Sequence, residues 1–466
     1  MDSLYERLSA YGEGDYYPMH MPGHKRNEVL MGMCDPCRID ITEIDGFDNL
    51  SHPEGILKEL EEEAGALYGG ARTFCLVNGS TSGLLAGIGA LTRPGDKVLM
   101  SRNCHKSVYN AVVINQLHPV YLYPDTDPDT GIAVGVRPEQ VERKLKEDPQ
   151  IRLVILVSPT YEGVLSDVKE IGRAAHSYHV PLLVDGAHGA HFGFHRYFPP
   201  SAVSEGADIT VHSIHKTLPA FTQTALLHIQ GPFISEERMK RYINMYQTTS
   251  PSYVLMAGIG RCVNVLREQG QPLFEKLARN IDRFTGQMEQ LRHLSLMKQP
   301  EGYRKDPSKL VILAGGTVSG PQLADRLRRE FHIETEMEGP DYVLAMTGIG
   351  DRDEGFQRLA EALCRIDREL RPAQIPAAAG RTLPEAVKAA EAWEVLESEC
   401  MELPLNESRG RIAGEYISLY PPGIPLLVPG ERITGEFLDF AAGARTAGLT
   451  LHGLGKTGRI KVDGHS

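Results

Sequence analysis

The sequence predicts an α/β protein built on one large, mostly parallel sheet, followed by smaller α+β segments. The chain has 466 residues, more than a single hydrophobic core usually serves, so several domains are expected. Short apolar runs alternate with helical patterns, and these runs are continuously apolar rather than alternating with polar residues. Strands of that kind are buried on both faces, as in a parallel sheet covered by helices.

The elements of this large domain can be placed in order. Residues 1–50 predict an N-terminal arm, because they are rich in Gly, Pro, Met and His and show little periodicity. A helix is expected from Ser51 onward and should end at Gly69-Gly70. Helices are also predicted at Pro138–Lys146 and Asp167–Tyr178. Seven strands are expected at Thr73–Val77, Lys97–Met100, Val120–Tyr123, Leu153–Val157, Leu182–Val184, Ile209–Val211 and Ala225–Ile229.

The rest of the chain divides into two smaller units. The large α/β domain is predicted over residues 51–292 and becomes helical after about residue 235. A small α+β domain is expected at 293–371, with strands at Leu310–Leu313 and Tyr342–Met346. A Pro/Ala-rich linker then leads into a C-terminal domain at 372–466, which contains the run Tyr420-Pro421-Pro422-Gly423-Ile424-Pro425.

Composition and charge exclude several kinds of protein. A net charge of −12 provides no basic field for a nucleic acid. The N-terminus lacks the basic start and apolar run of a secretory signal, and no apolar stretch is long enough to span a membrane. Seven cysteines, an odd number, indicate reduced thiols and a cytoplasmic location. No metal is expected, because Cys34 and Cys37 form a lone C-x-x-C without a second pair.

Three predicted strand ends carry residues suited to chemistry, and ligands of open α/β sheets gather at the carboxyl ends of strands. The first strand leads into Asn78-Gly79-Ser80-Thr81-Ser82-Gly83, which could bind an anion at a helix N-terminus or serve as a simple N-cap. Asp185 ends a second strand, and Lys216 follows a third. Singly, either could be structural. Together, an anion loop, an Asp and a Lys at one sheet edge are what pyridoxal 5'-phosphate requires.

The chain resembles the bacterial Orn/Lys/Arg decarboxylases, which have the aspartate-aminotransferase-like (type I) fold. The resemblance runs over nearly the whole chain and is of the short form, without the N-terminal receiver-like domain of the large inducible members. It implies a pyridoxal-phosphate enzyme that decarboxylates a basic amino acid for polyamine synthesis. Arginine is favoured, giving agmatine and CO2, with lysine and ornithine as alternatives. The motifs that carry it are Met21-Pro22-Gly23-His24-Lys25, Asp45-Gly46-Phe47-Asp48-Asn49-Leu50, the Asn78–Gly83 loop, His105-Lys106-Ser107, Asp185-Gly186-Ala187-His188, Ser213-Ile214-His215-Lys216, Thr249-Ser250-Pro251 and Tyr420–Pro425.

The resemblance also implies a role for each matching residue. Lys216 would form the Schiff base, Asp185 would pair with the pyridinium, His105 would stack on the ring and His215 would reprotonate Cα. Thr249 would reach the phosphate of the neighbouring subunit, which makes the active site a property of a homodimer. The remaining cofactor-binding residues would be Ser80, Thr81, Ser82, Ala187, His188 and Ser213.

For the substrate's distal cation the sequence offers Glu415, Glu431 and His24, although solvated surface positions suit the two glutamates equally well. Two other functions stay open at this point. A transaminase or β-lyase would use the same cofactor motifs, and Arg411 could then anchor an α-carboxylate. A non-catalytic amine-binding paralogue is the second alternative, although such a protein would be expected to have lost Lys216.

Overall fold

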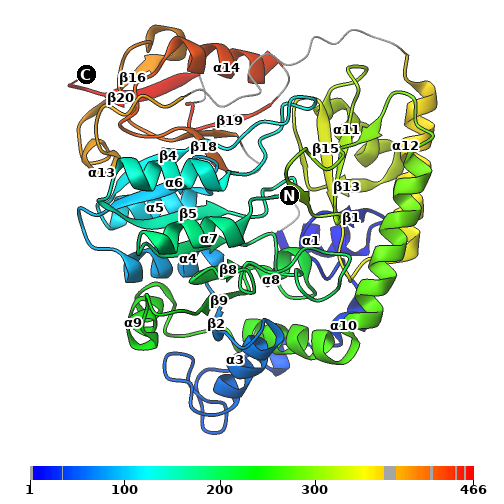
Figure 1. Cartoon of the computed structure of the whole chain (residues 1–466). Helices are drawn as coiled ribbons and strands as arrows, with labels where there is room; N and C mark the ends of the chain where they lie inside the picture. The colour runs from blue at the N-terminus through cyan, green and yellow to red at the C-terminus, as the bar shows by residue number, and fades with distance from the viewer. Residues whose placement is uncertain are drawn as a thin grey trace.

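A seven-stranded sheet with helices on both faces forms the centre of the molecule (Figure 1). The computed structural model describes residues 4–33, 35–371, 385–419, 423–446, 449–455 and 458–465. Five neighbouring strands run parallel, while one strand is antiparallel to both of its neighbours, so the predicted mostly parallel sheet is confirmed. In order across the sheet, the strands are β2 (Arg72–Leu76), β9 (Ala225–Ile229), β8 (Ile209–His212), β7 (Leu182–Asp185), β5 (Ile151–Val157), β3 (Lys97–Ser101) and β4 (His118–Leu122).

Amphipathic helices pack on the two faces of this sheet and exclude water from its apolar strands. The first face is covered by α4 (Gly79–Leu91), α5 (Lys106–Ile114) and α9 (Glu236–Tyr246), and the second by α6 (Pro138–Glu147) and α7 (Val168–Ser177). Helix α7 starts where the sequence predicts, because the Asp167 side chain accepts a hydrogen bond from the Glu170 N–H at 3.1 Å.

Helix α3 (Ile56–Leu67) begins later than the expected start near Ser51. The carboxylate of Asp48 accepts hydrogen bonds from the backbone N–H groups of Glu54, Gly55 and Leu57, at 3.1, 2.8 and 3.1 Å. These bonds hold the preceding residues in a loop and satisfy the free N–H groups at the helix start. The helix ends as predicted, just before Gly69 and Gly70, which both have positive φ.

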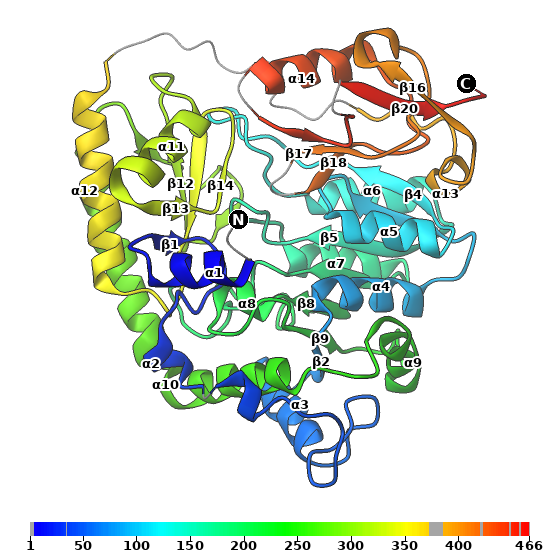
Figure 2. The ribbon, with the colours of Figure 1, turned by 180° about the vertical axis from the view of Figure 1, so that it is seen from behind.

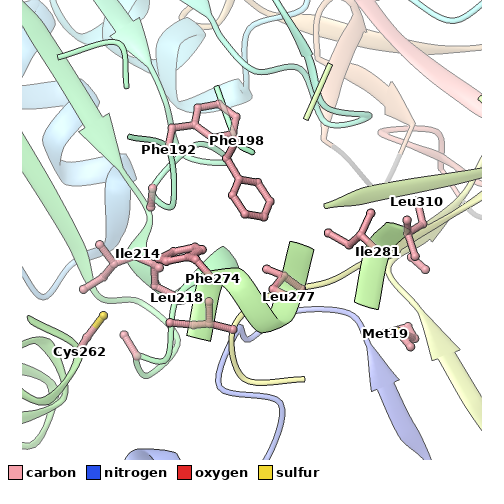
Figure 3. Packing of buried hydrophobic residues seen from close by; sticks show 14 of the residues in the cluster. Met19, Phe192, Phe198, Ile214, Leu218, Cys262, Phe274, Leu277, Ile281 and Leu310 are labelled. Carbon is pink, nitrogen blue, oxygen red and sulfur yellow. The ribbon is translucent and has the colours of Figure 1, made fainter. Parts of the chain in front are cut away.

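A long helix, α10 (Tyr253–Met288), joins the large domain to the segments that follow it. Its buried side chains Phe274, Leu277 and Ile281 pack among Phe198 of the large domain and Leu310 of the next strand region (Figure 3). One continuous hydrophobic core therefore extends from the large sheet into the smaller one. The other short elements of the large domain are β6 (Val164–Leu165) and α8 (Ile214–Thr217).

A four-stranded sheet follows α10, and both strands predicted in this part of the chain are present in it. Its order is β10 (Ser295–Leu296), β12 (Lys309–Leu313), β15 (Tyr342–Met346) and β14 (Met337–Glu338). The helices α11 (Gly320–Phe331) and α12 (Asp353–Glu369) belong to the same unit, and β11 (Arg304–Lys305) pairs with β6.

The N-terminal arm is more ordered than its sequence suggests. It contains α1 (Leu4–Glu13), β1 (Tyr17–Met19), α2 (Glu28–Met31) and a short 3-10 helix, η1 (Pro36–Arg38). Strand β1 pairs in parallel with β13 (Ile333–Thr335) in a separate two-stranded sheet, so the arm lies beside the smaller unit (Figure 2). The buried ammonium of Lys25 donates to the carbonyls of Pro18, His20 and Met346, at 3.1, 2.7 and 2.8 Å. These contacts fasten the arm beside the cavity described below.

The C-terminal segment lies over the β4 edge of the large sheet in both views. Its elements are α13 (Ala392–Val395), β16 (Cys400–Pro404), η2 (Leu405–Glu407), β17 (Ile417–Leu419), β18 (Ile424–Leu427), α14 (Gly435–Thr446), β19 (Leu451–His452) and β20 (Arg459–Asp463). The predicted linker after Arg371, Tyr420–Pro422 and Cys34 lie outside the described residues. Within the described ranges, every helix is too short or too polar to cross a membrane.

Candidate active site

A cavity of about 840 Å³ opens at the carboxyl ends of the parallel strands. It is bordered by the large sheet, by residues 334–342 of the smaller unit and by the C-terminal segment. The structure therefore brings together residues that the sequence places in separate motifs. The predicted residues that line the cavity are Ser80, His105, Asp185, Ala187, His188 and Lys216.

Lys216 lies on α8, directly after β8, and its amine faces the cavity. Its Nζ lies 2.8 Å from Nε2 of His188 and 5.9 Å from the ring centroid of Tyr161. Burial lowers the pKa of Lys216, while the Asp185 carboxylate opposes that shift. A buried amine with a lowered pKa is a better nucleophile at neutral pH than a solvated lysine.

A close backbone contact fixes the segment that carries Lys216. The Gly23 N–H donates to the His215 carbonyl at 2.7 Å. A Cβ atom on Gly23 would lie 2.7 Å from the backbone of Thr217 and Leu218, so only glycine allows this approach. The Pro22-Gly23-His24-Lys25 motif thus contributes to the site through its backbone.

Asp185 is the last residue of β7, and its side chain is 4% exposed. Its Oδ1 accepts a hydrogen bond from the Ala187 N–H at 3.1 Å. Burial raises the pKa of Asp185, and the positive charge of Lys216 counteracts that effect. A carboxylate buried in this way is stabilised by a cationic partner, which a ligand in the cavity can supply.

The N-terminus of α4 presents hydroxyl groups at the same edge of the sheet. Ser213 Oγ donates to Ser80 Oγ at 2.8 Å, so these two predicted residues meet across 133 positions of sequence. Ser82 Oγ donates to the Gly79 carbonyl at 2.8 Å and so stabilises the first turn. Thr81 is exposed and lies outside the cavity lining. Free N–H groups and hydroxyls at the start of a 13-residue helix suit an anionic group.

Two predicted histidines occupy different positions relative to the cavity. His105 lines it and caps α5, with Nδ1 2.8 Å from Ser107 Oγ. Burial, aided by the charge of Lys216, lowers the pKa of His105 to about 4, so its ring is neutral near pH 7. His215 is absent from the described cavity lining, and its Nδ1 lies 2.8 Å from the Thr224 carbonyl. Burial also lowers the pKa of His215 to about 4.

The other predicted residues lie away from the described lining of the cavity. Glu415 lies 3.4 Å from Lys461, and Nδ1 of His24 accepts from the Arg26 N–H at 3.1 Å. Thr249 is exposed. Arg411 donates to the Asp463 carbonyl at 3.3 Å, so in this chain it does not point into the cavity.

Glu431 forms a buried ion pair that joins the C-terminal segment to the large sheet. It is 2% exposed, and its carboxylate lies 3.1 Å from Nη2 of Arg102, which is 1% exposed. Arg102 also donates to the carbonyls of Pro425 and Leu426, at 2.6 and 3.1 Å. Because Leu426 lines the cavity, this arginine holds one wall of the site in place.

Replacing Arg102 with Met is expected to destabilise the C-terminal segment, because Glu431 would stay buried without its cation. Breaking a buried pair of this kind costs about 3–5 kcal/mol. The midpoint of thermal unfolding should fall by several degrees, and residues 385–466 should become more sensitive to protease.

The matched control is Arg267→Met, which breaks the pair between Arg267 and Glu63. The side chains of these two residues are 48% and 45% exposed. That loss should cost about 1 kcal/mol or less. Equal effects of the two changes would contradict the role of Arg102.

Several cavity residues are absent from the predicted set. Tyr161 and Glu162 follow β5, so the strand-end rule that found Asp185 could have found them. Glu336 accepts from the Met21 N–H at 2.9 Å and from the Tyr161 hydroxyl, and Glu162 accepts from the Tyr342 hydroxyl at 2.8 Å. Glu336 lies between the short strands β13 and β14, where the sequence gives no comparable signal.

The fold and this site define an α/β enzyme with the type I fold. This fold is found among pyridoxal-phosphate-dependent enzymes. An alanine–glyoxylate aminotransferase from Nostoc sp. has a TM-score of 0.58 at 15% identity, covering 76% of this chain and 95% of its own. A lysine decarboxylase from Francisella novicida has a TM-score of 0.79 at 20% identity, covering 99% of this chain and 84% of its own. At such identities, both similarities concern the fold.

The chain belongs to the Orn/Lys/Arg decarboxylase family. The model of the Orn/Lys/Arg decarboxylase major domain matches residues 2–309, and that of the C-terminal domain matches residues 374–455. An arginine decarboxylase from Bacillus subtilis (strain 168) is 32% identical, with 97% of this chain and 95% of the relative covered. The constitutive lysine decarboxylase of Escherichia coli (strain K12) is 25% identical, with 86% of this chain and 69% of the relative covered. The reaction is decarboxylation of a basic amino acid, a small-molecule substrate, rather than the transamination, β-elimination or non-catalytic amine binding that the sequence left open.

Proposed function

We propose that this chain binds pyridoxal 5'-phosphate in the 840 Å³ cavity and decarboxylates arginine to agmatine and CO2. The observation that carries the proposal is the convergence of Lys216, Asp185 and Ser80 on one cavity at the carboxyl ends of the sheet. Arginine is preferred over lysine because the arginine decarboxylase of Bacillus subtilis (strain 168) is 32% identical over almost the whole chain, against 25% for the constitutive lysine decarboxylase of Escherichia coli (strain K12).

The residues present fit this cofactor. Lys216 supplies an amine of lowered pKa for its aldehyde, and Asp185 supplies a buried carboxylate for its ring nitrogen. The start of α4, with Ser80 and the adjoining Ser213, supplies donors for its phosphate. When bound, the cofactor would provide an electron-withdrawing ring that stabilises the negative charge left at Cα as CO2 departs.

The chain's own residues then have separate tasks. Asp185 would keep a proton on the ring nitrogen, because a buried carboxylate beside that nitrogen would favour its charged form. His105, which lines the cavity and is neutral at pH 7, would pack against the ring without adding a competing charge. Lys216 would hold the cofactor through its amine, which is the nucleophile that the cavity offers to an aldehyde. His215 remains a predicted proton donor to Cα, and Thr81, Ser82, Ala187 and His188 remain predicted cofactor contacts.

Acidic side chains in the cavity support a cationic substrate. Besides Asp185, the described lining contains Glu162, Glu334, Glu336, Glu338 and Asp341. No arginine is present among the described lining residues, so this chain offers no described guanidinium to retain an α-carboxylate. A decarboxylase needs that carboxylate to leave, whereas a transaminase keeps it in place. Glu415, Glu431 and His24 remain predicted substrate contacts, although within this chain they lie off the described lining.

The test of the substrate is CO2 release from the purified holoenzyme supplied in turn with arginine, lysine and ornithine, with each product amine identified. We expect arginine to give the highest kcat/KM, by about tenfold or more, because a planar guanidinium can pair with a carboxylate in bidentate fashion. Faster release from lysine or ornithine would overturn the choice of arginine. No CO2 from any of the three would contradict the activity itself.

We also propose that the active site forms between two copies of the chain in a homodimer. Thr249 lies outside its own chain's described cavity lining and is exposed, as expected for a residue that reaches a neighbouring phosphate. The apolar side chains Ile44, Phe47 and Ile56 are 51%, 46% and 56% exposed, and they support association of copies because water-exposed apolar groups favour burial.

We further propose that the protein is cytoplasmic. Its proposed domains are residues 51–292, 293–371 and 372–466.

Mixing inactive subunits tests the shared site. Thr249→Glu should lower activity by about tenfold or more, because a carboxylate would repel the phosphate. Co-expression of Thr249→Glu with Lys216→Ala chains should restore activity, because one of the two sites in a mixed dimer then carries neither change. Activity no higher than that of the separate variants would show that Thr249 does not act across the interface.

A further inference from the structure

A second buried lysine lies directly behind the imidazole that contacts Lys216. Lys309, the first residue of β12, is 0% exposed and is not part of the described cavity lining. Its Nζ lies 3.0 Å from Nδ1 of His188, while Nζ of Lys216 lies 2.8 Å from Nε2 of the same ring. The imidazole therefore bridges two primary amines, one facing the cavity and one enclosed in the protein.

The hydrogen-bonding capacity of imidazole limits the charges on the two lysines. A neutral imidazole has one N–H donor and one acceptor nitrogen, whereas an ammonium can only donate. Two ammonium groups would need two acceptors on the His188 ring, and a neutral ring has one. Burial lowers the pKa of His188 well below its ordinary value, helped by Lys216 and Lys309, so a protonated ring is disfavoured. At neutral pH this arrangement therefore accommodates one ammonium, on either lysine.

We propose that Lys309 is a positioning residue for Lys216, and that the two lysines share one proton through the tautomers of His188. The proposal rests on the function proposed above, in which Lys216 carries the cofactor. In one state Lys216 is the ammonium, Nδ1 of His188 carries the hydrogen, and Lys309 is a neutral amine. In the other state Lys309 is the ammonium, Nε2 carries the hydrogen, and Lys216 is neutral.

The exchange between these states conserves protons. Lys216 gives one proton to Nε2 while Nδ1 gives its proton to the Lys309 amine, and no proton passes to solvent. The result is a neutral Lys216, the only form of the amine that can attack a carbonyl carbon. This exchange would return Lys216 to its nucleophilic form after each turnover without taking a proton from solvent or releasing one to it.

The charged groups around the bridge are consistent with a single shared proton. Burial lowers the pKa of Lys309 to about 7, opposed by Asp306 and Glu336 and assisted by Lys216 and Lys25. Asp306 Oδ1 is already held by Ser308 Oγ at 2.7 Å and lies 3.2 Å from His191.

Lys216 and His188 face their own set of titratable groups. Asp185 and Glu336 raise the pKa of Lys216 against the effect of burial. Burial lowers the pKa of His105 and of His215 to about 4, so neither ring adds a positive charge beside His188 at pH 7.

Gly163 keeps Lys309 in this position. A Cβ atom at residue 163 would lie 2.6 Å from Cγ of Lys309 and 3.2 Å from Cβ of Asp306. The Asp306 N–H also donates to the Gly163 carbonyl at 2.7 Å. The loop after β5 thus packs directly on the lysine stem, which leaves the amine directed at His188.

The experiment measures the titration of Lys216 itself in cofactor-free protein. Brief labelling with acetic anhydride across a range of pH, with mass spectrometry of the peptide that contains Lys216, gives the midpoint of its deprotonation. Lys309→Met removes the partner cation and should raise that midpoint by about one pH unit or more. Lys309→Arg keeps a permanent cation at this place and should lower the midpoint instead.

Two further variants separate this role from a structural one. Lys305→Met removes a neighbouring lysine whose Nζ donates to the Lys309 carbonyl at 2.7 Å but does not contact His188. It should leave the Lys216 midpoint unchanged. In a His188→Phe background, Lys309→Met should no longer raise the midpoint, because the bridge is gone; this comparison also serves if the Arg variant does not fold.

The outcomes distinguish this proposal from the proposed function. An identical midpoint in wild type and Lys309→Met, or an equal rise in Lys305→Met, would overturn the shared proton. Cofactor binding is measured separately, by absorbance of the reconstituted wild type. If the cofactor binds normally but the Lys216 midpoint does not change in the Lys309 variants, only the role of Lys309 is refuted. If the cofactor does not bind covalently, the proposed function is refuted, whatever the midpoints are.

Discussion

Changing Lys216 to Ala should remove the absorbance band of the lysine-bound cofactor and lower turnover by about four orders of magnitude or more. The reason is that Lys216 is the described amine that both faces the cavity and has a lowered pKa. Without it, the cofactor would be held by non-covalent contacts only, and the product would have no internal amine to displace it. Absorbance spectra and single-turnover CO2 release measure the two effects independently.

The matched variants for this experiment are Lys216→Arg and Lys106→Ala. Arginine keeps the positive charge beside Asp185 but is not a nucleophile, so Lys216→Arg should be as inactive as the Ala variant. Lys106 is exposed and is the first residue of α5, directly after its His105 cap and outside the described lining, so its loss should leave the band intact. Steady-state turnover retained by either Lys216 variant would contradict a covalent role.

The sequence predicts the parts of this molecule that depend on local patterns. All seven predicted strands are present, because continuous apolar runs report burial on both faces of a sheet. Asp167 and Tyr178, the bounds of the predicted helix, are the two caps of α7, because a cap acts on the backbone a few residues away. Ser80, Asp185 and Lys216 lie in one cavity for a similar reason, since each follows a strand and strand ends meet at one edge.

The parts that the sequence does not predict depend on contacts between distant residues. The start of α3 is set by the Asp48 carboxylate, which accepts from the N–H of Leu57 nine positions later. Strand β1 forms because Tyr17 pairs with Ile333, and no periodicity in the arm indicates such a partner. The sequence offers Glu431 for the substrate's distal cation, but its actual partner, Arg102, is 329 residues away. Lys309 and His188, 121 residues apart, are equally beyond local patterns.

The second large effect is expected at Asp185. Changing it to Asn keeps the shape of the side chain and an oxygen that can accept from the Ala187 N–H, but removes the charge. An amide beside the ring nitrogen would no longer favour its protonated form, so the negative charge developing at Cα would be less stabilised. We expect kcat to fall by about 10²–10³-fold, the loss seen when one preorganised electrostatic partner is removed.

Cofactor affinity should change much less than rate in this variant, because Lys216 and the start of α4 remain. Asp185→Ala should behave similarly, whereas Asp185→Glu, which keeps the charge on a longer side chain, should retain more activity than either. Measuring kcat together with the cofactor dissociation constant distinguishes a role of Asp185 in the chemical step from a role in cofactor binding. A parallel loss of both would assign Asp185 to binding, and an unaltered kcat would exclude its role at the ring nitrogen. Burial raises the pKa of this carboxylate and costs stability in the empty site. A selective loss of kcat would show that this burial serves the chemical step.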